Sequence, residues 1–300
     1  MRGSPTRQAK SVLAMLKRIG ESKHQAKARA KAFSSAGLNS RKGLGIFSHN
    51  TAKNYQATYV RFFTWARESY GITDATQLTS EHAREWLTMN IERNLSYDTL
   101  QSYASALEKL PVAFETMNID HDSNWSSVVQ ECRDVGKQAL SNERKSRAFK
   151  EPFRIVEQLT GRYRIAADLQ LRCGCRIGEI TELKIGRNIV GNNQLVLTNT
   201  KGGLVRTVTV PAQLYNQLNN VINEHGVFRI DQKSYALELK HVAKQLGERW
   251  SGTHSLRWNY ARNEMFRLEM QKNMSFDQAR YAVSRSMGHR RPEITEWYLR

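Results

Sequence analysis

Apolar residues recur at helical spacing through much of the first half of the chain. In residues 51–70, a period of about 3.6 residues places Tyr55, Tyr59, Phe62 and Ala66 on one face, which predicts an amphipathic helix. Further faces of this kind begin at residue 79 and occur in residues 96–110 and 128–140. Short connections between such helices predict a small bundle over residues 46–140, with its aromatic residues in the core rather than stacked on bases.

The second half of the chain mixes helical and strand-like patterns. Two β-rich runs, residues 194–198 and 204–210, flank Asn199-Thr200-Lys201-Gly202-Gly203, which predicts a hairpin with glycines in its turn. The predicted fold class is therefore mainly α with a small antiparallel β-sheet. Helical patterns lie on both sides of the hairpin, in residues 163–172, 212–223, 233–246, 254–270 and 275–287, and a last short helix begins at Pro292.

Polar, basic segments flank the predicted bundle. Within a basic leader over residues 1–45, residues 1–36 are rich in alanine, lysine and arginine, which favour helices, and Val12 and Leu16 lie at helical spacing. We interpret residues 1–36 as one or two basic helices, with a solvated tail as the alternative, and the glycine-containing residues 34–48 as a linker. Residues 141–152 are polar and end at a proline, which predicts a linker before a second domain over residues 153–300.

The charge of the chain indicates a polyanionic partner. The sequence holds 46 lysines and arginines against 28 aspartates and glutamates, a formal net charge of +18. The excess lies in residues 1–45, which contain eleven basic residues and one acidic residue, and in residues 141–300. Residues 46–140 are net acidic. Nucleic acid suits such an excess better than a membrane surface does. DNA contact is therefore the candidate role of the leader.

No segment of the sequence suits a membrane span or a disulfide scaffold. No run of about 18 apolar residues is present, and the apolar stretch near the N-terminus is too short for a signal peptide. The three cysteines, Cys132, Cys173 and Cys175, lack framework spacing, which is typical of a reducing cytoplasm. Cys173 and Cys175 could be half of a metal site, but no matching second pair of ligands follows. We expect small buried thiols there, no metal and no cofactor.

Four short motifs follow one another in the second half of the chain. An arginine comes after a tight turn in Leu171-Arg-Cys-Gly-Cys-Arg176, and Glu179 lies three residues further on. Each motif alone is weak, because it occurs by chance in many chains, whereas the four in this order are specific. The other three are a lysine at the hairpin tip, a His-x-x-Arg pair, and a Met-Gly-His triplet nine residues before a tyrosine: Lys201, His254 with Arg257, and His289 with Tyr298.

In these motifs the chain resembles the tyrosine recombinase (phage integrase) family. The match covers residues 150–298, and residues 46–140 resemble the family's helical core-binding domain more loosely, through Asn50-Thr51-x-x-x-Tyr55. The resemblance implies a site-specific recombinase that cuts and rejoins DNA through a covalent 3′-phosphotyrosine. It also implies a mixed α/β catalytic domain with the catalytic residues Arg176, Lys201, His254, Arg257, His289 and Tyr298.

The chemistry of phosphodiester cleavage explains why these residue types occur together. The hydroxyl of Tyr298 would attack phosphorus, which needs help because a tyrosine has an ordinary pKa near 10. Arg176 and Arg257 would hold the non-bridging oxygens with permanently charged forks. Such a fixed field can stabilise the transition state without a metal. The phosphotyrosine bond keeps the energy of the broken phosphodiester, so rejoining needs no ATP.

The remaining residues of the motifs would handle protons and positioning. His289 would donate a further hydrogen bond to the phosphate. His254 would act as base or proton relay, because histidine ordinarily titrates near neutrality. The resemblance implies Lys201 as the general acid for the leaving 5′-oxygen and Glu179 as the group that orients Arg176 or His254.

Each matched residue also has a purely structural interpretation. Arg176 could form a surface ion pair, His254 could cap a helix, and Tyr298 could anchor the last helix. Lys201 could be a polar turn residue, since Arg206 lies on the same hairpin. Two other functions use part of the same pattern: a type IB topoisomerase-like enzyme that relaxes DNA, and a catalytically inactive DNA-binding architectural protein.

The resemblance also implies partners. Double-stranded DNA with a specific core site would be bound by a homotetramer that is a monomer when free, with accessory DNA-bending proteins and without a membrane. The expected location is the cytoplasm, on the nucleoid, in a bacterium or phage-infected cell. The chain departs from the family at Trp258, where a histidine often follows the arginine. It ends at Arg300, whereas many relatives continue into a tail that docks on a neighbouring subunit.

Overall fold

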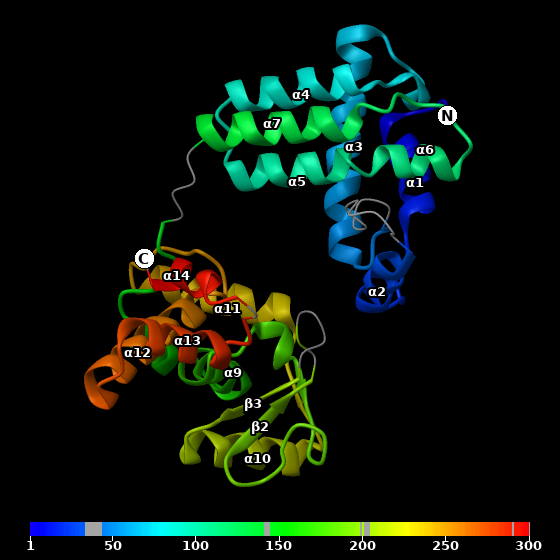
Figure 1. Cartoon of the computed structure of the whole chain (residues 1–300). Coiled ribbons are helices and arrows are strands. Elements are labelled where there is room, and N and C mark those ends of the chain that lie inside the picture. The colour runs from blue at the N-terminus through cyan, green and yellow to red at the C-terminus, as the bar shows by residue number, and fades with distance from the viewer. Residues whose placement is uncertain (34–43, 141–144, 199, 201–204, 290, 300) are drawn as a thin grey trace. The chain divides into compact units, whose positions relative to one another are not determined.

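The computed structural model of the chain describes residues 1–33, 44–140, 145–198, 200, 205–289 and 291–299. The chain divides into two compact units, Met1–Glu143 and Arg144–Arg300, each with a hydrophobic core of its own. Figure 1 shows the helices of both units and the short strands of the second. The predicted fold class, mainly α with a small antiparallel sheet, is confirmed. None of the described helices combines the length and apolarity that a bilayer span requires.

The first unit is a bundle built around the long helix α3 (His49–Tyr70). Ser48 accepts a hydrogen bond from a first-turn amide of this helix, and Gly71, with a φ of 67°, ends it. Tyr59 and Phe62 are fully buried, as predicted for the aromatic residues. The other elements are α1 (Pro5–Leu16), α2 (Lys23–Phe33), η1 (Ala75–Gln77), α4 (Ser80–Glu92), α5 (Tyr97–Leu107), α6 (Leu110–Thr116) and α7 (Trp125–Ala139).

Helix α1 belongs to the core of the first unit. Val12 and Leu16 are buried, and the helix packs against α3 and α6. The buried side chain of Gln8 accepts a hydrogen bond from the amide of Ala75 and donates one to the carbonyl of Thr73. Helix α1 is therefore folded into the unit, and the interpretation of this stretch as a solvated tail is wrong. DNA contact by the leader stays a prediction.

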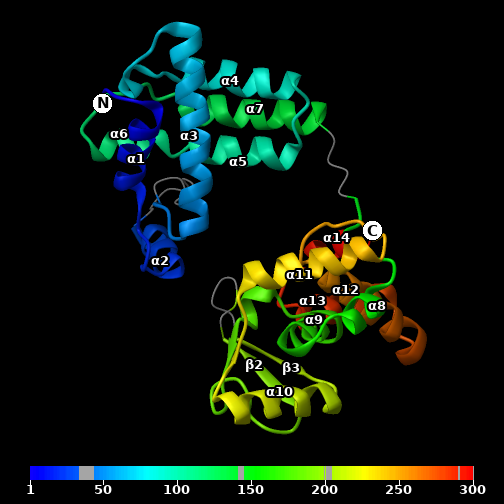
Figure 2. The ribbon, with the colours of Figure 1, turned by 180° about the vertical axis from the view of Figure 1, so that it is seen from behind.

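The second unit surrounds helix α9 (Gly161–Cys173), which is buried continuously from Ile165 to Leu171. The other helical elements are α8 (Pro152–Gln158), η2 (Ile177–Glu179), α10 (Ala212–His225), α11 (Gln232–Gln245), α12 (Ser255–Lys272), α13 (Phe276–Ser286) and α14 (Glu293–Leu299). In both views α9, α11, α12 and α13 pack together, and the sheet formed by β2 (Gln194–Leu197) and β3 (Arg206–Thr209) lies with α10 at one end of the unit (Figures 1 and 2).

The strands β2 and β3 form the antiparallel hairpin that the sequence predicts. Leu195 pairs with Val208, and Leu197 pairs with Arg206. Alternate residues of a strand face the same side, so Arg206 shares the buried side of Val208. The hairpin tip, with Lys201, lies outside the described residues. A second short antiparallel pair joins β1 (Glu182–Leu183) to β4 (Phe228–Arg229).

Candidate active site

A tight turn after α9 places Arg176. The helix ends at Gly174, whose φ of 60° lies in the left-handed region that favours glycine. A Cβ at this position would also collide with the ring of Tyr260 on α12. Arg176 follows at once and begins the 3₁₀ turn η2, so the tight turn predicted before this arginine is confirmed.

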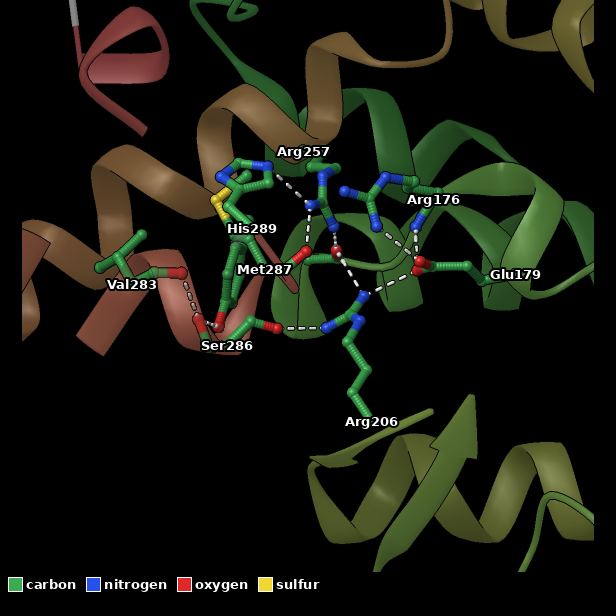
Figure 3. A network of polar contacts seen from close by, with 10 residues as sticks. Arg176, Glu179, Arg206, Arg257, Val283, Ser286, Met287 and His289 are labelled. Atoms are coloured by element: carbon green, nitrogen blue, oxygen red, sulfur yellow. Dashed lines mark hydrogen bonds and ion pairs between the residues drawn. The ribbon is translucent and has the colours of Figure 1, made fainter. Parts of the chain in front are cut away.

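The carboxylate of Glu179 lies buried between two arginines (Figure 3). Its Oε1 accepts a hydrogen bond from Arg176 Nη1 at 2.7 Å, and its Oε2 accepts one from Arg206 Nη2 at 2.7 Å. Burial raises the pKa of Glu179, but the charge of Arg206 and the hydrogen bonds of both arginines lower it more, so the net shift is downward. Glu179 therefore contacts Arg176, one of the two residues that it was predicted to orient. Within the described parts of the chain, no hydrogen bond joins it to His254.

Arg257 is fully buried in the first turn of α12. Its guanidinium donates hydrogen bonds to the carbonyl oxygens of Gly174 and Met287, which fix its plane (Figure 3). Its Nη2 also lies 3.2 Å from Nε2 of His289. Arg257 thus joins the turn after α9 to the loop after α13.

The cluster carries an excess of positive charge. Arg176, Arg206 and Arg257 bring three guanidinium groups around the single carboxylate of Glu179. Burial, with the charges of the other two arginines, lowers the pKa of Arg257 to about 10, which leaves it charged at neutral pH. An anion such as a phosphate would offset this excess. A cavity of about 380 Å³ opens beside the cluster, lined by Val205, Arg206, Tyr281, Ser284, Arg285, Gly288, His289 and Pro292.

The ring of His289 is held between Arg257 and Thr295. Its Nδ1 lies 3.0 Å from Thr295 Oγ1, and burial, followed by the charges of Arg257 and Arg176, lowers its pKa to about 3. The ring is therefore neutral at neutral pH. Because an arginine has only donors, Nε2 must accept from Arg257, which leaves the proton on Nδ1 for donation to Thr295. His289 is thus an acceptor on the side that faces the cluster.

Tyr298 contacts His254 of the same chain. The distance from Tyr298 Oη to His254 Nε2 is 2.7 Å, and the rings of Trp258 and His289 lie 5.1 and 5.3 Å from the Tyr298 ring, between centroids. His254 immediately precedes α12 as its N-cap residue, but its side chain makes no capping hydrogen bond. Burial, followed by the charge of Arg257, lowers the pKa of His254 to about 3, so the near-neutral value expected for it is wrong. A neutral imidazole accepts the hydrogen bond that the Tyr298 hydroxyl donates.

Packing of α14 holds Tyr298 in this place. Thr295 is fully buried, and Tyr298 and Leu299 pack against a cluster from α12 and α13 that includes Val283 and Met287. The anchoring role considered for Tyr298 thus accompanies its contact with His254 and does not replace it.

The structure brings six of the residues singled out in the sequence into one region. Lys201, the seventh, lies outside the described residues. The four motifs do not include Arg206, although its side chain is part of this cluster. A signal existed, because Arg206 shares the parity of the apolar Val208 on a strand and so must face the interior. The assembled residues are Arg176, Glu179, His254, Arg257, His289 and Tyr298.

Cys173 and Cys175 flank Gly174 in the turn before Arg176. Cys173 and Cys175 are buried, and burial raises the pKa of both thiols, that of Cys175 to about 12. Among the described residues, no group of three or more His, Cys, Asp or Glu side chains is placed to hold a metal ion.

Solved structures of several recombinases share this fold. XerH site-specific recombinase, bound to a palindromic difH substrate in a post-cleavage complex, is 14% identical, with a TM-score of 0.61 over 100% of this chain and 94% of that chain. A lambda integrase dimer bound to a COC′ core site is 17% identical, with a TM-score of 0.59 over 92% of this chain and 77% of that chain. The Tn1549 transposon integrase, in complex with transposon right end DNA, is 14% identical, with a TM-score of 0.59 over 92% of this chain and 94% of that chain. The comparison with curated proteins gives no match.

Two family models match the sequence directly. The model of the phage integrase N-terminal SAM-like domain matches residues 38–113. The model of the phage integrase family matches residues 147–300, which is more than half of the chain and contains the whole cluster around Arg257. The chain therefore belongs to the phage integrase family, the tyrosine recombinases, which are DNA-binding enzymes of site-specific recombination.

Proposed function

We propose that Tyr298 cuts one DNA strand at a core site and becomes joined to the 3′-phosphate of that strand. A new 5′-hydroxyl then displaces the tyrosine. The observation that carries this proposal is the 2.7 Å contact between the Tyr298 hydroxyl and His254, beside a buried arginine cluster. A tyrosine that donates to a neutral imidazole can transfer its proton as it attacks. The arginine cluster supplies the site for the phosphate that is attacked.

The cleavage step balances with residues of this chain. The Tyr298 oxygen forms a bond to phosphorus while the bond from phosphorus to the 5′-oxygen breaks. Arg176 and Arg257 bind the non-bridging oxygens, where negative charge builds up, and their fixed orientation is the main source of rate enhancement. His254 takes the tyrosine proton, and Lys201 gives a proton to the leaving 5′-oxygen. The reverse step rejoins the strand and restores both protons.

Phosphate binding would change the state of His289. Its pKa is low because burial and the charges of Arg257 and Arg176 disfavour the imidazolium. A bound phosphate offsets those charges, so the pKa of His289 rises and Nε2 gains a proton. It can then donate to a non-bridging oxygen, while Thr295, a hydroxyl, can still serve Nδ1 as acceptor. In this proposal His289 becomes a phosphate ligand only once the substrate is in place.

The proposed partner is double-stranded DNA with a specific core site. The lambda integrase and XerH structures, which hold a core site and a palindromic substrate, support this choice. We propose four protomers acting on two duplexes on the nucleoid, with accessory DNA-bending proteins and with the basic residues 1–45 on flanking DNA. Phosphate contacts would dominate binding and make it steeply dependent on salt.

A covalent-complex assay tests the proposed function. Footprinting of DNA beside the gene would locate the core site, and a nicked duplex carrying that site would trap the cleaved intermediate. We expect a complex that survives denaturant with the wild-type chain and disappears in Tyr298→Phe, with DNA binding retained. Arg176→Ala should also lose cleavage. A complex that persists in Tyr298→Phe would refute the role of this tyrosine, and relaxation of supercoils without pairing of two sites would favour the topoisomerase alternative.

A further inference from the structure

Arg206 is a buried charge to which the proposed cleavage step gives no role. It begins β3, pairs across the hairpin with Leu197, and points away from the sheet toward the arginine cluster (Figure 3). Its side chain is 7% exposed, although it stands only five residues after Lys201 in the hairpin. A long cation so nearly removed from water must be compensated by its contacts.

Those contacts join three segments of the site. Arg206 Nη2 donates to Glu179 Oε2 at 2.7 Å and to the carbonyl oxygen of Gly174 at 3.2 Å, and Nη1 donates to the carbonyl oxygen of Ser286. Glu179 lies in η2, Gly174 ends α9, and Ser286 ends α13. Each of these segments adjoins a proposed catalytic residue, namely Arg176, Arg257 through its own bond to Gly174, and His289.

The shared carboxylate makes Arg206 and Arg176 interdependent. Glu179 offers Oε1 to the guanidinium of Arg176 and Oε2 to Arg206 and to the backbone amide of Arg176. If Arg206 were removed, Oε2 would lose its strongest partner, and the carboxylate could rotate toward Arg176. The plane of the Arg176 fork would then change, although Arg206 itself touches no reacting atom.

The backbone near Arg206 is shaped to accommodate it. Gly288 has a φ of 67°, which favours glycine, and a Cβ there would lie 2.9 Å from Cδ of Arg206 and 3.2 Å from its Nε. The loop that carries His289 therefore packs directly on this side chain. A smaller residue at position 206 would leave that loop without its support.

We propose that Arg206 is a positioning residue, which sets the orientation of Arg176 through Glu179 and fixes the loop of His289 for phosphate binding. This inference rests on the proposed function. A residue that served stability alone would lower the melting temperature without changing the chemistry of a folded variant. A positioning residue changes the cleavage rate of the folded variant and depends on the residue through which it acts.

The test is a double-mutant cycle on single-turnover cleavage of nicked core-site DNA. Arg206→Gln and Arg206→Lys should cleave about 10- to 100-fold more slowly, as expected for a small misplacement of a catalytic group, with DNA affinity changed less than about threefold. In an Arg176→Lys background, Arg206→Gln should slow cleavage by a much smaller factor than it does in the wild-type chain, because the group that Arg206 positions is already altered. Arg229→Gln removes an exposed arginine that pairs with Glu182, and serves as the matched control.

Each outcome decides the proposal. A folded Arg206→Gln variant that cleaves at the wild-type rate would overturn it, and so would fully multiplicative losses in the double variant. Failure of both Arg206→Gln and Arg206→Lys to fold would assign the residue to stability alone and would also overturn it. Absence of any covalent complex with the wild-type chain would instead refute the proposed function, so the two failures are distinguishable.

Discussion

Tyr298 Oη lies 2.7 Å from His254 Nε2, which joins the last turn of α14 to the residue directly preceding α12. The two residues are 44 positions apart, and the packing of α14 against α12 and α13 brings them together. The proposed nucleophile and its proposed proton acceptor therefore meet within one chain. We infer that the arginine cluster beside this pair is the place where the phosphate of the DNA binds.

Trp258 should control how well Tyr298 is held. Its ring lies 5.1 Å from that of Tyr298 and is almost fully buried. Trp258→Ala removes this packing, so we expect single-turnover cleavage to fall about tenfold or more while DNA affinity changes little. Trp258→His, which keeps a flat ring, should retain more activity. Wild-type cleavage by a folded Trp258→Ala variant would show that the ring contact has no functional role.

Thr295 should set the proton position on His289. Its hydroxyl lies 3.0 Å from Nδ1 and is fully buried. Thr295→Val keeps the shape but leaves that N–H without a partner, which costs about 1–3 kcal/mol. We expect a lower melting temperature and slower cleavage, with Thr295→Ser close to wild type. Equal behaviour of the valine and serine variants would contradict the inferred hydrogen bond.

The two site histidines should make stability depend on pH. Their pKa values fall from 6.5 to about 3 on folding, so the unfolded chain binds more protons below pH 6.5. Stability is thus fully present above pH 6.5 and is lost as the pH falls toward 3, by roughly 1.4 kcal/mol per pH unit for each histidine. Denaturant titrations give the free energy of unfolding at each pH. Between pH 6 and pH 4.5 this free energy should fall less steeply with pH in His254→Gln and His289→Gln than in the wild-type chain. His225→Gln, outside the site, is the control, and an unchanged slope in the site variants would contradict the shifts.

Glu179 should stabilise the catalytic unit by pairing with two arginines. Glu179→Gln leaves Arg176 and Arg206 without their shared carboxylate, and loss of one partner of a buried pair costs roughly 3 kcal/mol or more. Glu182→Gln is the matched control, because Glu182 is 36% exposed and pairs with the exposed Arg229. A surface pair of this kind contributes about 0–1 kcal/mol. Similar urea midpoints for the two variants would show that the buried network adds little stability.

Periodicity and motif order were enough to predict much of this molecule. The aromatic face of α3, the turn before Arg176 and the strands of the hairpin all follow from local pattern, because burial of one face and the conformational freedom of glycine act over a few residues. The order of the motifs also indicated which residues would meet. Local pattern could not predict the pKa values and hydrogen-bond partners of the site residues, since those depend on contacts between residues distant in sequence.

His254 and Arg206 show this limit most clearly. Histidine ordinarily titrates near neutrality, but burial beside Arg257 lowers the pKa of His254 to about 3. Arg206 lies near Lys201 on the predicted hairpin, but its partner Glu179 lies 27 residues away in the sequence. Arg206 obtains its partners where β3 packs against η2 and the ends of α9 and α13, and His254 obtains its own where α14 packs on α12. Strand parity indicates that Arg206 faces the interior, but it does not give these distant partners.

Identification of the residue that becomes joined to the DNA tests the proposed role of Tyr298 most directly. The wild-type chain, trapped on a nicked core-site duplex, would be digested with nuclease and protease and analysed by mass spectrometry. We predict a nucleotide attached through phosphate to the peptide that contains Tyr298, and no such peptide from Tyr298→Phe. A nucleotide attached to any other residue, or an adduct of equal yield from Tyr298→Phe, would contradict the assignment of Tyr298 as the nucleophile.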